Sequence, residues 1–255
     1  MRAVVVGASS GLGRCIAVGL GQRGAQVALL ARRVDRLADA AKETGAGALT
    51  IGCDVTDEAS CREAIEEAGA GLGGIDALVY APGIGPLLKL AETDLDTWRR
   101  VLDTNVIGAS MITAAAIDHL EASQGVAAYL SSVSASLTPP WPGLGAYAVS
   151  KAALDKLIDA WRNEHPHVGF TRVVVGDCAG GPGDAMSGFS TDWDHGLAAE
   201  LVPTWVTRQY LSGSLLEVEE LVNVVDTVVR CGASASIHSV TVAPRRAAPD
   251  LGLST

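Results

Sequence analysis

Residues 4–13 read VVVGASSGLG, and this stretch decides the fold. A short apolar run opens into a turn with glycines at positions 7, 11 and 13, and an amphipathic run over residues 14–23 follows it. Glycine lets the backbone turn tightly and lets a phosphate approach the bare main chain. The helix that follows directs its free N–H groups and its positive dipole end at such an anion. We therefore predict a dinucleotide site with the pyrophosphate at the helix start, made by Gly7, Ser9, Ser10, Gly11, Leu12 and Gly13.

The same residues also match G-x-S-x-G around Ser9, which is the nucleophile elbow of hydrolases. That nucleophile needs several strands before it to build the sheet on which it stands, and here only a few residues precede Ser9. The phosphate site is the better interpretation.

Length and composition indicate one large α/β domain over residues 1–255, because 48% of the residues are apolar and 19% are charged. No apolar run reaches the ~20 residues that span a bilayer. We expect no membrane association and no secretory signal. The net charge of −10 disfavours nucleic acid as a partner. Five scattered cysteines without a C-x-x-C pair indicate reduced thiols in a cytoplasmic protein, and we expect no metal site.

Short apolar runs alternate with helical patterns along the chain, which favours a parallel sheet covered by helices on both faces. Strands are expected at residues 3–6, 26–31, 48–53, 77–80, 126–131, 169–175 and 237–242. Helices are expected at residues 12–23, 34–43, 57–69, 94–120, 145–164 and 218–230, with a loop-rich stretch before residue 210.

Arginines stand where a dinucleotide site usually carries the residue that contacts the ribose. About 20 residues past the glycine turn, an NAD site presents an acid to the 2′-hydroxyl. This chain has Ala31, Arg32 and Arg33 there, and a guanidinium suits a 2′-phosphate. NADP(H) is therefore favoured over NAD(H), and Arg14 is a further candidate for the basic patch. The alternative is a pair of solvated arginines at a helix start.

Three further positions follow from the strand ends, where ligands bind in such sheets. Asp54 and Val55 follow the third strand, and the Asp54 carboxylate suits an adenine amino group. Ala81 and Gly83 leave the fourth strand in a sharp turn beside the cofactor. Asn105 and Gly108 lie inside the long helix expected over residues 94–120 and cost it stability relative to alanine, which indicates either a local distortion that frees a carbonyl or plain tolerance.

Tyr147 and Lys151 share one helix face four residues apart, on the helix after a strand that ends in serines. A phenol titrates near ~10, too high for acid–base work at neutral pH. An ammonium ~5 Å away, at an effective dielectric of ~20, would lower that pKa by about two units. A neighbouring hydroxyl, Ser132, would hold the substrate oxygen, with Ser134 as the alternative serine.

Together these motifs resemble the short-chain dehydrogenase/reductase family over residues 2–175. The motifs are GASSGLG from Gly7, NVIG from Asn105, and YAVSK from Tyr147 behind SSVS. The resemblance implies a Rossmann-like sheet of seven parallel strands in the order 3-2-1-4-5-6-7. It implies Tyr147 as the catalytic acid–base, Lys151 as its partner and the ligand of the nicotinamide ribose, and Ser132 on the substrate oxygen. Asn105 would anchor a water in the proton relay, and Asp54 would meet adenine.

The chain departs from the family at three places. Val6 stands where threonine is usual, and Tyr80-Ala81-Pro82-Gly83 replaces Asn-Asn-Ala-Gly. The Pro-Gly after strand six is replaced by GDCAGGPG at residues 176–183. Contacts made by the usual residues must therefore be lost or replaced.

We expect an oxidoreductase that moves a hydride between NADP(H) and a carbonyl/secondary alcohol of a hydrophobic small molecule. Residues 180–215 carry aromatics and are expected to form a lid over the site, although packing of the loop alone would also account for them. The apolar helices 94–120 and 145–164 indicate a homodimer or homotetramer. Alternatives are a silent nucleotide-binding sensor or scaffold, and an epimerase or dehydratase that keeps its cofactor bound.

Overall fold

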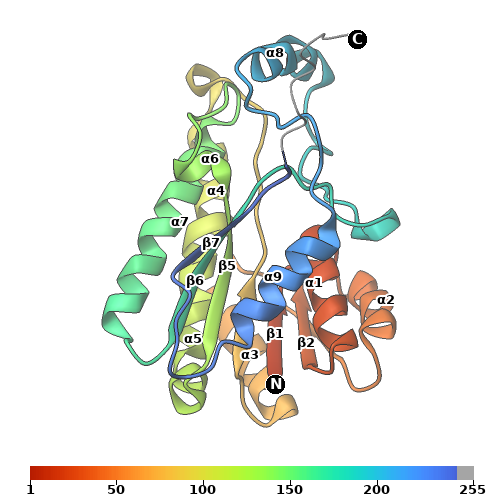
Figure 1. Cartoon of the computed structure of the whole chain (residues 1–255), viewed down its shortest axis with the longest axis vertical. Coiled ribbons are helices and arrows are strands. Elements are labelled where there is room, and N and C mark those ends of the chain that lie inside the picture. The colour runs from red at the N-terminus through yellow and green to blue at the C-terminus, as the bar shows by residue number, and fades with distance from the viewer. Residues whose placement is uncertain (246–255) are drawn as a thin grey trace, which may run out of the picture.

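Seven parallel strands form one sheet in the order β3-β2-β1-β4-β5-β6-β7, which confirms the expected doubly wound fold (Figure 1). The structure is a computed structural model and describes residues 1–245. The last ten residues of the expected domain, 246–255, lie outside the described part. The elements in chain order are β1 (Arg2–Val6), α1 (Gly11–Gln22), β2 (Gln26–Ala31), α2 (Val34–Thr44), β3 (Leu49–Gly52), α3 (Glu58–Leu72), β4 (Ala77–Tyr80), η1 (Leu90–Glu92), α4 (Leu95–Leu102), η2 (Asp103–Ile107), α5 (Gly108–Ser123), β5 (Val126–Ser132), α6 (Val133–Ser136), α7 (Gly145–Glu164), β6 (Gly169–Val175), η3 (Gly183–Ala185), α8 (His195–Thr207), α9 (Val218–Val229) and β7 (Ser239–Val242).

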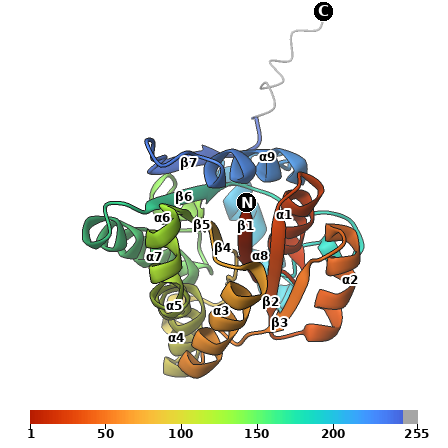
Figure 2. The same cartoon turned by 90° about the horizontal axis from the view of Figure 1, so that it is seen from below.

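Helices cover both faces of the sheet, and each face has its own apolar layer (Figure 2). On one face, α3, α5 and α7 pack through residues such as Ile65, Ile112 and Ile158. On the other, α1, α2 and α9 pack through residues such as Leu20, Leu37 and Val225. The strands are nearly all apolar because they are buried on both sides. The glycine turn follows β1, and the serines stand at the end of β5. Both therefore lie at the carboxyl ends of the parallel strands, on the same edge of the sheet.

The helix expected over residues 94–120 is interrupted at its centre. Residues Asp103–Ile107 form a π-helical turn between α4 and α5, at the asparagine that disfavours regular helix. Of the two interpretations of Asn105, local distortion is the one that the structure shows. The whole stretch, Leu95–Ser123, has the length and hydropathy of a membrane span, but it packs against α3, α7, β4 and β5 as a core helix of the domain.

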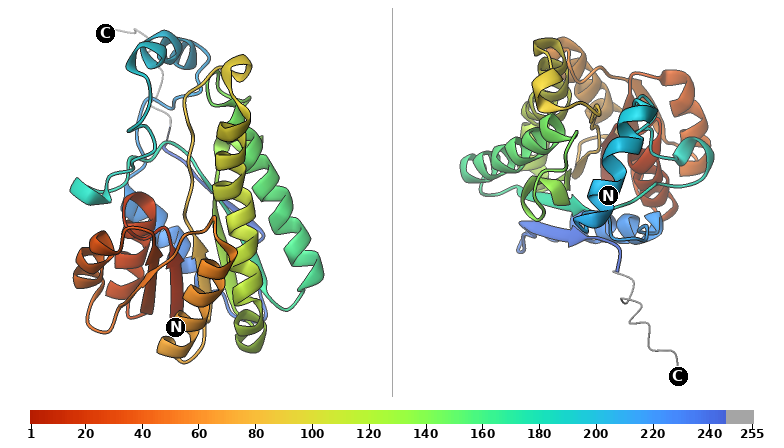
Figure 3. Two further views of the ribbon diagram at one scale, coloured as in Figure 1. Left: turned by 180° about the vertical axis from the view of Figure 1, so that it is seen from behind. Right: turned by 90° about the horizontal axis from the view of Figure 1, so that it is seen from above.

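The stretch expected to be loop-rich contains a helix of 13 residues, α8, and the expectation is wrong there. Asp194 caps the helix by accepting a hydrogen bond from the N–H of Leu197 at 2.7 Å. Pro203 lies inside the helix, which is why the pattern did not suggest one. Figures 1 and 3 show α8 beyond the carboxyl ends of the strands, across the edge that carries the candidate site.

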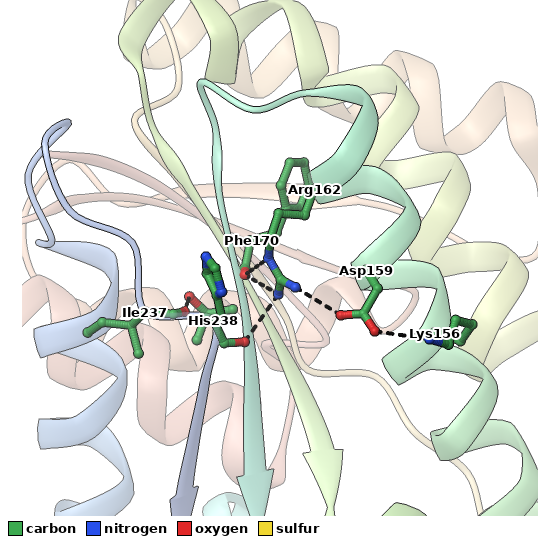
Figure 4. A network of polar contacts seen from close by, with 7 residues as sticks. Lys156, Asp159, Arg162, Phe170, Ile237 and His238 are labelled. Atoms are coloured by element: carbon green, nitrogen blue, oxygen red, sulfur yellow. Dashed lines mark hydrogen bonds and ion pairs between the residues drawn. The ribbon is translucent and has the colours of Figure 1, made fainter.

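Near the C-terminal end of α7, Arg162 joins this helix to β6 and to the chain before β7 (Figure 4). Its Nη2 donates to the carbonyl of Phe170 in β6 at 2.7 Å and to that of His238 before β7 at 3.2 Å. Its Nη1 donates to Asp159 at 2.8 Å. This network fixes the C-terminal end of α7 on the sheet, and so supports the position of the helix that carries Tyr147.

Candidate active site

The glycine-rich turn joins β1 to α1 and has the backbone that its sequence predicts. Gly7 and Gly11 have positive φ angles of 82° and 58°. A Cβ at Gly13 would lie 2.4 Å from the carbonyl oxygen of Gly7, so only glycine fits there. The N–H of Gly7 donates to Leu30 of β2 at 2.8 Å, which pins the turn to the sheet. Helix α1 begins at Gly11, so its first N–H groups face the turn.

Arg33 lies across this turn. Its Nη2 donates to the hydroxyls of Ser10 at 2.6 Å and Ser9 at 3.0 Å. The hydrogen-bond partner of Ser9 is thus an arginine, which cannot serve as a general base, and this argues against the hydrolase interpretation.

The other two arginines of the expected patch behave differently. Arg32 is exposed, and its charge acts on Asp54. Arg14 is buried and pairs with Glu43 near the end of α2 at 2.7 Å, so it holds α1 against α2. Only Nη2 of Arg14 is used in this pair, and Nε and Nη1 are buried without a hydrogen-bond partner in the part of the chain that the structure describes, so its contribution to the basic patch stays a prediction.

Asp54 stands just past β3, with its carboxylate partly engaged. Its Oδ1 accepts hydrogen bonds from the N–H of Thr56 at 3.0 Å and from the Thr56 hydroxyl at 2.8 Å. Burial acts to raise the pKa of Asp54, but these bonds and the charge of Arg32 lower it overall. Asp54 is therefore an anion at neutral pH. Val55 beside it is buried, and its carbonyl lies against Gly108 at the start of α5.

The exit from β4 links the glycine turn to Lys151. Pro82 lies against Gly7, whose added Cβ would be 3.0 Å from the Pro82 nitrogen, and Ala81 packs beside Gly13. A Cβ at Gly83 would lie 3.3 Å from Nζ of Lys151 and 3.9 Å from Oδ1 of Asn105. Ala81, Pro82 and Gly83, which stand where the family has Asn-Ala-Gly, therefore line the space between the glycine turn and Lys151.

Asn105 lies fully buried in the π-helical turn, and its side-chain amide is fully used. Its Nδ2 donates to the carbonyl of Ile84 at 2.9 Å and to the hydroxyl of Ser150 at 2.8 Å, while its Oδ1 accepts from the N–H of Ile84 at 2.9 Å. Both amide hydrogens are therefore spent. A water at Asn105 could therefore only donate a hydrogen bond to a carbonyl oxygen of this residue. The water-anchoring role of Asn105 stays a prediction, now limited to its carbonyl groups.

Tyr80 replaces the first asparagine of the family motif and provides a new contact. It is fully buried, and its hydroxyl donates to the carbonyl of Thr104 in the π-helical turn at 2.6 Å. A Cβ at Gly108 would lie 2.8 Å from that hydroxyl, so Tyr80 and Gly108 fit together. The sequence showed the replacement at residue 80 but not the carbonyl that it would satisfy.

The serines and Tyr147 meet at the end of β5. Ser132 is the last residue of β5, and its side chain acts to lower the pKa of Tyr147. Ser134 lies in the short helix α6 with its hydroxyl 2.9 Å from that of Ser132, and the Ser134 N–H also donates to Ser132 at 3.2 Å. Both serines are buried. Ser132 is therefore the serine that acts on the tyrosine, and Ser134 is hydrogen-bonded to Ser132.

Lys151 lies beside Tyr147, but it does not lower the pKa of the phenol in this structure. Its Nζ is 5.8 Å from the centre of the Tyr147 ring and donates to the carbonyl of Leu130 at 2.7 Å. Burial lowers the pKa of Lys151 to about 8, partly opposed by the charge of Asp155. Burial raises the pKa of Tyr147 to about 12, partly opposed by the hydrogen bond with Ser132. The expected two-unit fall is wrong here, because desolvation exceeds the attraction and the amine loses its proton first.

Aromatic side chains from the segment between β6 and α9, residues 176–217, cover Tyr147. Phe189 packs edge-on against Tyr147 with ring centres 4.8 Å apart. Beyond it lies an apolar cluster whose buried members are Leu87, Trp141, Leu144, Leu201 and Trp205. Aromatics were expected in this segment, but no periodic pattern pointed to Phe189 as the contact of the tyrosine.

Asp177 replaces the usual proline after β6 and fastens the far side of this segment. Its carboxylate accepts from the N–H and the hydroxyl of Ser212, both at 2.9 Å, and its carbonyl accepts from Leu216 at 2.7 Å. Across the site, Lys89 pairs with Glu200 of α8 at 2.8 Å.

The five cysteines are free thiols. Within residues 1–245, no group of three or more histidine, cysteine or acidic side chains is placed to hold a metal ion.

Comparison with known proteins gives a consistent assignment. The model of the short chain dehydrogenase family matches residues 1–186. The chain is 30% identical over 242 residues to cis-4-hydroxycyclohexanecarboxylate dehydrogenase of Sinomonas cyclohexanicum, covering 93% of this chain and 92% of that protein. It spans 18% to 63% of the length of the first five curated relatives that it matches.

Solved structures share the fold. An alcohol dehydrogenase of the archaeon Thermococcus sibiricus complexed with 5-hydroxy-NADP superposes with a TM-score of 0.79 at 23% identity, over 94% of both chains. A 3-ketoacyl-(acyl-carrier-protein) reductase of Brucella melitensis complexed with NADH gives 0.77 at 24% identity, over 94% of this chain and 96% of that chain. At these identities the likeness establishes the architecture, and the cofactors are those of the two neighbours.

Proposed function

Because the chain belongs to the short-chain dehydrogenase family, whose members are nicotinamide-dependent oxidoreductases, we propose that it transfers a hydride between NADP(H) and a carbonyl/secondary alcohol of a hydrophobic small molecule. The observation that carries this proposal is the grouping of three side chains at the end of β5: Ser132 acts on the pKa of the Tyr147 phenol, and Nζ of Lys151 lies 5.8 Å from the centre of the Tyr147 ring. The hydride is the chemistry that a bound nicotinamide supplies. The protein has to position the substrate oxygen and move one proton.

Tyr147 is the proposed acid–base group, and Ser132 holds the substrate oxygen. With its pKa raised to about 12, the phenol keeps its proton at neutral pH, so the structure as it stands suits proton donation to a carbonyl oxygen. In the opposite direction the phenol must lose its proton. Displacing Phe189 would readmit solvent to the phenol, and Lys151 as an ammonium would then favour the phenolate.

The residues present fit a dinucleotide. The turn at Gly7 and Gly11 and the start of α1 offer backbone N–H groups to a pyrophosphate, and Gly83 leaves space beside Lys151. The preference for NADP(H) rests on Arg32 and Arg33, with no acid at Ala31 to accept a ribose hydroxyl. Asp54 is proposed to meet the adenine. The backbone of Ser187 packs against Gly11, with its Cα 3.3 Å from an added Cβ there, so the segment after β6 lies beside the proposed pyrophosphate site.

The same arrangement supports proposals about the whole protein. Residues 1–255 are proposed to form a single domain in which residues 180–215 act as a lid. Leu95, Ile107 and Val149 expose apolar side chains on α4, the π-helical turn and α7, which supports a homodimer or homotetramer formed through these helices. Free thiols support a cytoplasmic location without membrane or nucleic-acid partners.

One experiment tests the proposed function. NADPH binding is measured by fluorescence or calorimetry, and a panel of ketones and aldehydes is then screened for NADPH oxidation. Turnover that disappears in Tyr147→Phe supports the proposal. Tight NADPH binding without turnover of any member would favour a sensor, an alternative that the covering of Tyr147 by Phe189 supports.

A further inference from the structure

The ring of Phe189 fills a space directly beside the proposed acid–base group. Its centre lies 4.8 Å from that of Tyr147, at an interplanar angle of 63°. Trp193 meets Phe189 from the far side, with ring centres 5.6 Å apart and planes at 70°. Phe189 is therefore enclosed by two aromatic rings in edge-to-face contact.

Gly85 makes this space large enough for a ring. A Cβ at Gly85 would lie 2.3 Å from Cζ and 2.4 Å from Cε2 of Phe189, and 3.1 Å from Cδ2 of Tyr147. The φ angle of Gly85 is not in the positive region, so its backbone does not itself require glycine. The absent side chain is thus explained by the ring that occupies its place. We call the space bounded by Tyr147, Gly85 and Trp193 the ring slot.

The walls of the ring slot are fixed independently of Phe189. Trp193 donates its indole N–H to the carbonyl of Gly85 at 2.8 Å. Its ring also packs against Trp205, with centres 5.8 Å apart. Tyr147 stands on α7, a regular helix of 20 residues. These contacts hold the walls of the ring slot through residues other than Phe189.

Phe189 itself is carried by irregular backbone. It lies outside the helices and strands of the segment, after Gly188 and within successive turns. The N–H of Thr191 bonds Gly188 at 3.2 Å, and that of Trp193 bonds Ser190 at 3.2 Å. A side chain on such a segment can leave its site without disturbing the sheet.

We propose that the ring slot is the subsite for a ring of the substrate, which takes the place of Phe189. The substrate oxygen has to reach the hydroxyls of Tyr147 and Ser132, so the group attached to the reacting carbon must occupy the space beside the phenol ring. That space is apolar, uncharged and shaped by a phenyl group. The substrate class is a ketone, or the matching secondary alcohol, whose reacting carbon lies in or next to a carbocyclic ring.

This inference rests on the proposed function, and ketone pairs matched in carbon number test it. The pairs are cyclohexanone with methyl butyl ketone, and acetophenone with methyl hexyl ketone, each reduced with NADPH. Wild-type protein should favour the cyclic member at least about tenfold in kcat/KM, because a preformed apolar slot rewards a rigid ring.

Two variants locate the preference in the ring slot. Gly85→Ala places a methyl group in the slot and should reduce kcat/KM for the cyclic ketones at least about tenfold. It should reduce kcat/KM for the open-chain ketones by a clearly smaller factor, because a flexible chain can adapt to the added methyl group, and should leave NADPH affinity within about threefold. Phe189→Ala removes the internal ring and should lower KM for cyclic ketones about two- to tenfold, the range of an edge-to-face contact. Gly232→Ala, whose Cβ meets nothing within 4 Å, and Leu215→Ala, at an exposed residue, are the matched controls.

Three results would overturn the inference: no cyclic preference in the wild type, an equal loss for both ketone classes in Gly85→Ala, or a raised KM in Phe189→Ala. In each of these the enzyme still reduces ketones, so the proposed function stands. NADPH binding without turnover of any of the four ketones would instead reject the proposed function and this inference with it.

Discussion

The hydroxyl of Tyr80 donates to the carbonyl of Thr104 at 2.6 Å, inside the π-helical turn that carries Asn105. A widened turn leaves a carbonyl without its helical partner, and Tyr80 supplies a donor from the neighbouring strand. The family's asparagine at this position has thus been replaced by a residue that supports the same distortion from the strand side.

Removal of this hydroxyl should affect both stability and rate. We expect Tyr80→Phe to lower the free energy of unfolding by about 1–3 kcal/mol, the cost of an unsatisfied polar group, and to lower kcat because Asn105 loses its fixed position. Denaturant unfolding and NADPH oxidation measure the two effects. Tyr129→Phe is the control. The buried hydroxyl of Tyr129 forms a 2.7 Å hydrogen bond with Thr113, which lies outside this turn. A similar fall in kcat in both variants would disprove the link.

Tyr147→Phe should lose about 10²–10⁴-fold in turnover, the usual contribution of a general acid–base group, while NADPH affinity stays unchanged. The ring and its contact with Phe189 remain, so the change removes one hydroxyl only. Steady-state rates with NADPH and fluorescence titration of the cofactor provide the two readouts. A variant with the wild-type rate would remove Tyr147 from the proposed mechanism.

Replacing Ser132 and replacing Ser134 should lower kcat/KM by different amounts. Ser132→Ala removes the group in contact with Tyr147, so we expect a loss of about 10²–10³-fold in kcat/KM, as for one oxyanion-type donor. Ser134→Ala removes only the support of Ser132 and should cost about tenfold or less. The kcat/KM of the two variants, measured with one ketone, decides the assignment. The reverse order would make Ser134 the substrate ligand.

Cofactor preference should depend on the arginines after β2. Arg33→Ala and Arg32→Ala should each weaken NADPH about tenfold to hundredfold, as expected for a charge-assisted hydrogen bond to the 2′-phosphate, and weaken NADH much less. Calorimetric dissociation constants for both cofactors give the ratio. Lys42→Ala, on the helix α2 that follows the arginines, is the control, because Lys42 is exposed and pairs only with Asp39 among the salt bridges of residues 1–245. Equal weakening of NADPH and NADH would mean that the two arginines are solvated surface residues.

Lys151→Met should stabilise the protein and abolish turnover. Burial lowers the pKa of Lys151 to about 8 from its usual 10.5, so the folded state holds fewer protons than the unfolded state between these values. The stability of the wild type therefore rises with pH across this window, and below pH 8 the protonated lysine imposes its full cost. The gain in melting temperature should be largest at pH 7 and should shrink towards pH 10.5. A gain that does not vary with pH would contradict the lowered pKa.

Most of the architecture could be predicted from local sequence signals. The alternation of apolar runs and helical patterns gave the parallel sheet, and the motifs gave its order through the family resemblance. The asparagine within residues 94–120 predicted the distortion that the π-helical turn shows. Helix α8 was missed because Pro203 and several β-branched residues weaken its pattern, and packing of Leu201 and Trp205 stabilises it instead.

The contacts of the candidate site depend on long-range packing, and for that reason the sequence left them open. Nothing near Tyr80 in the chain shows that its hydroxyl meets Thr104, and nothing near Gly85 shows that Phe189 lies against it. The pKa of Tyr147 differs from the sequence-based expectation, which includes the attraction between Tyr147 and Lys151 but not the desolvation of the phenol. That desolvation depends on the segment of residues 176–217, which is distant in the sequence and covers the phenol.

The separation between the segment of residues 176–217 and the strands below it has an evolutionary consequence. Polar contacts such as Asp177 with Ser212, Lys89 with Glu200 and Trp193 with Gly85 fasten that segment, whereas the proton-moving side chains stand on β5 and α7. Mutations that diversify the segment can therefore shift the range of accepted molecules without disturbing the bond-making step. Laboratory libraries confined to these residues offer a direct way to retarget the catalyst.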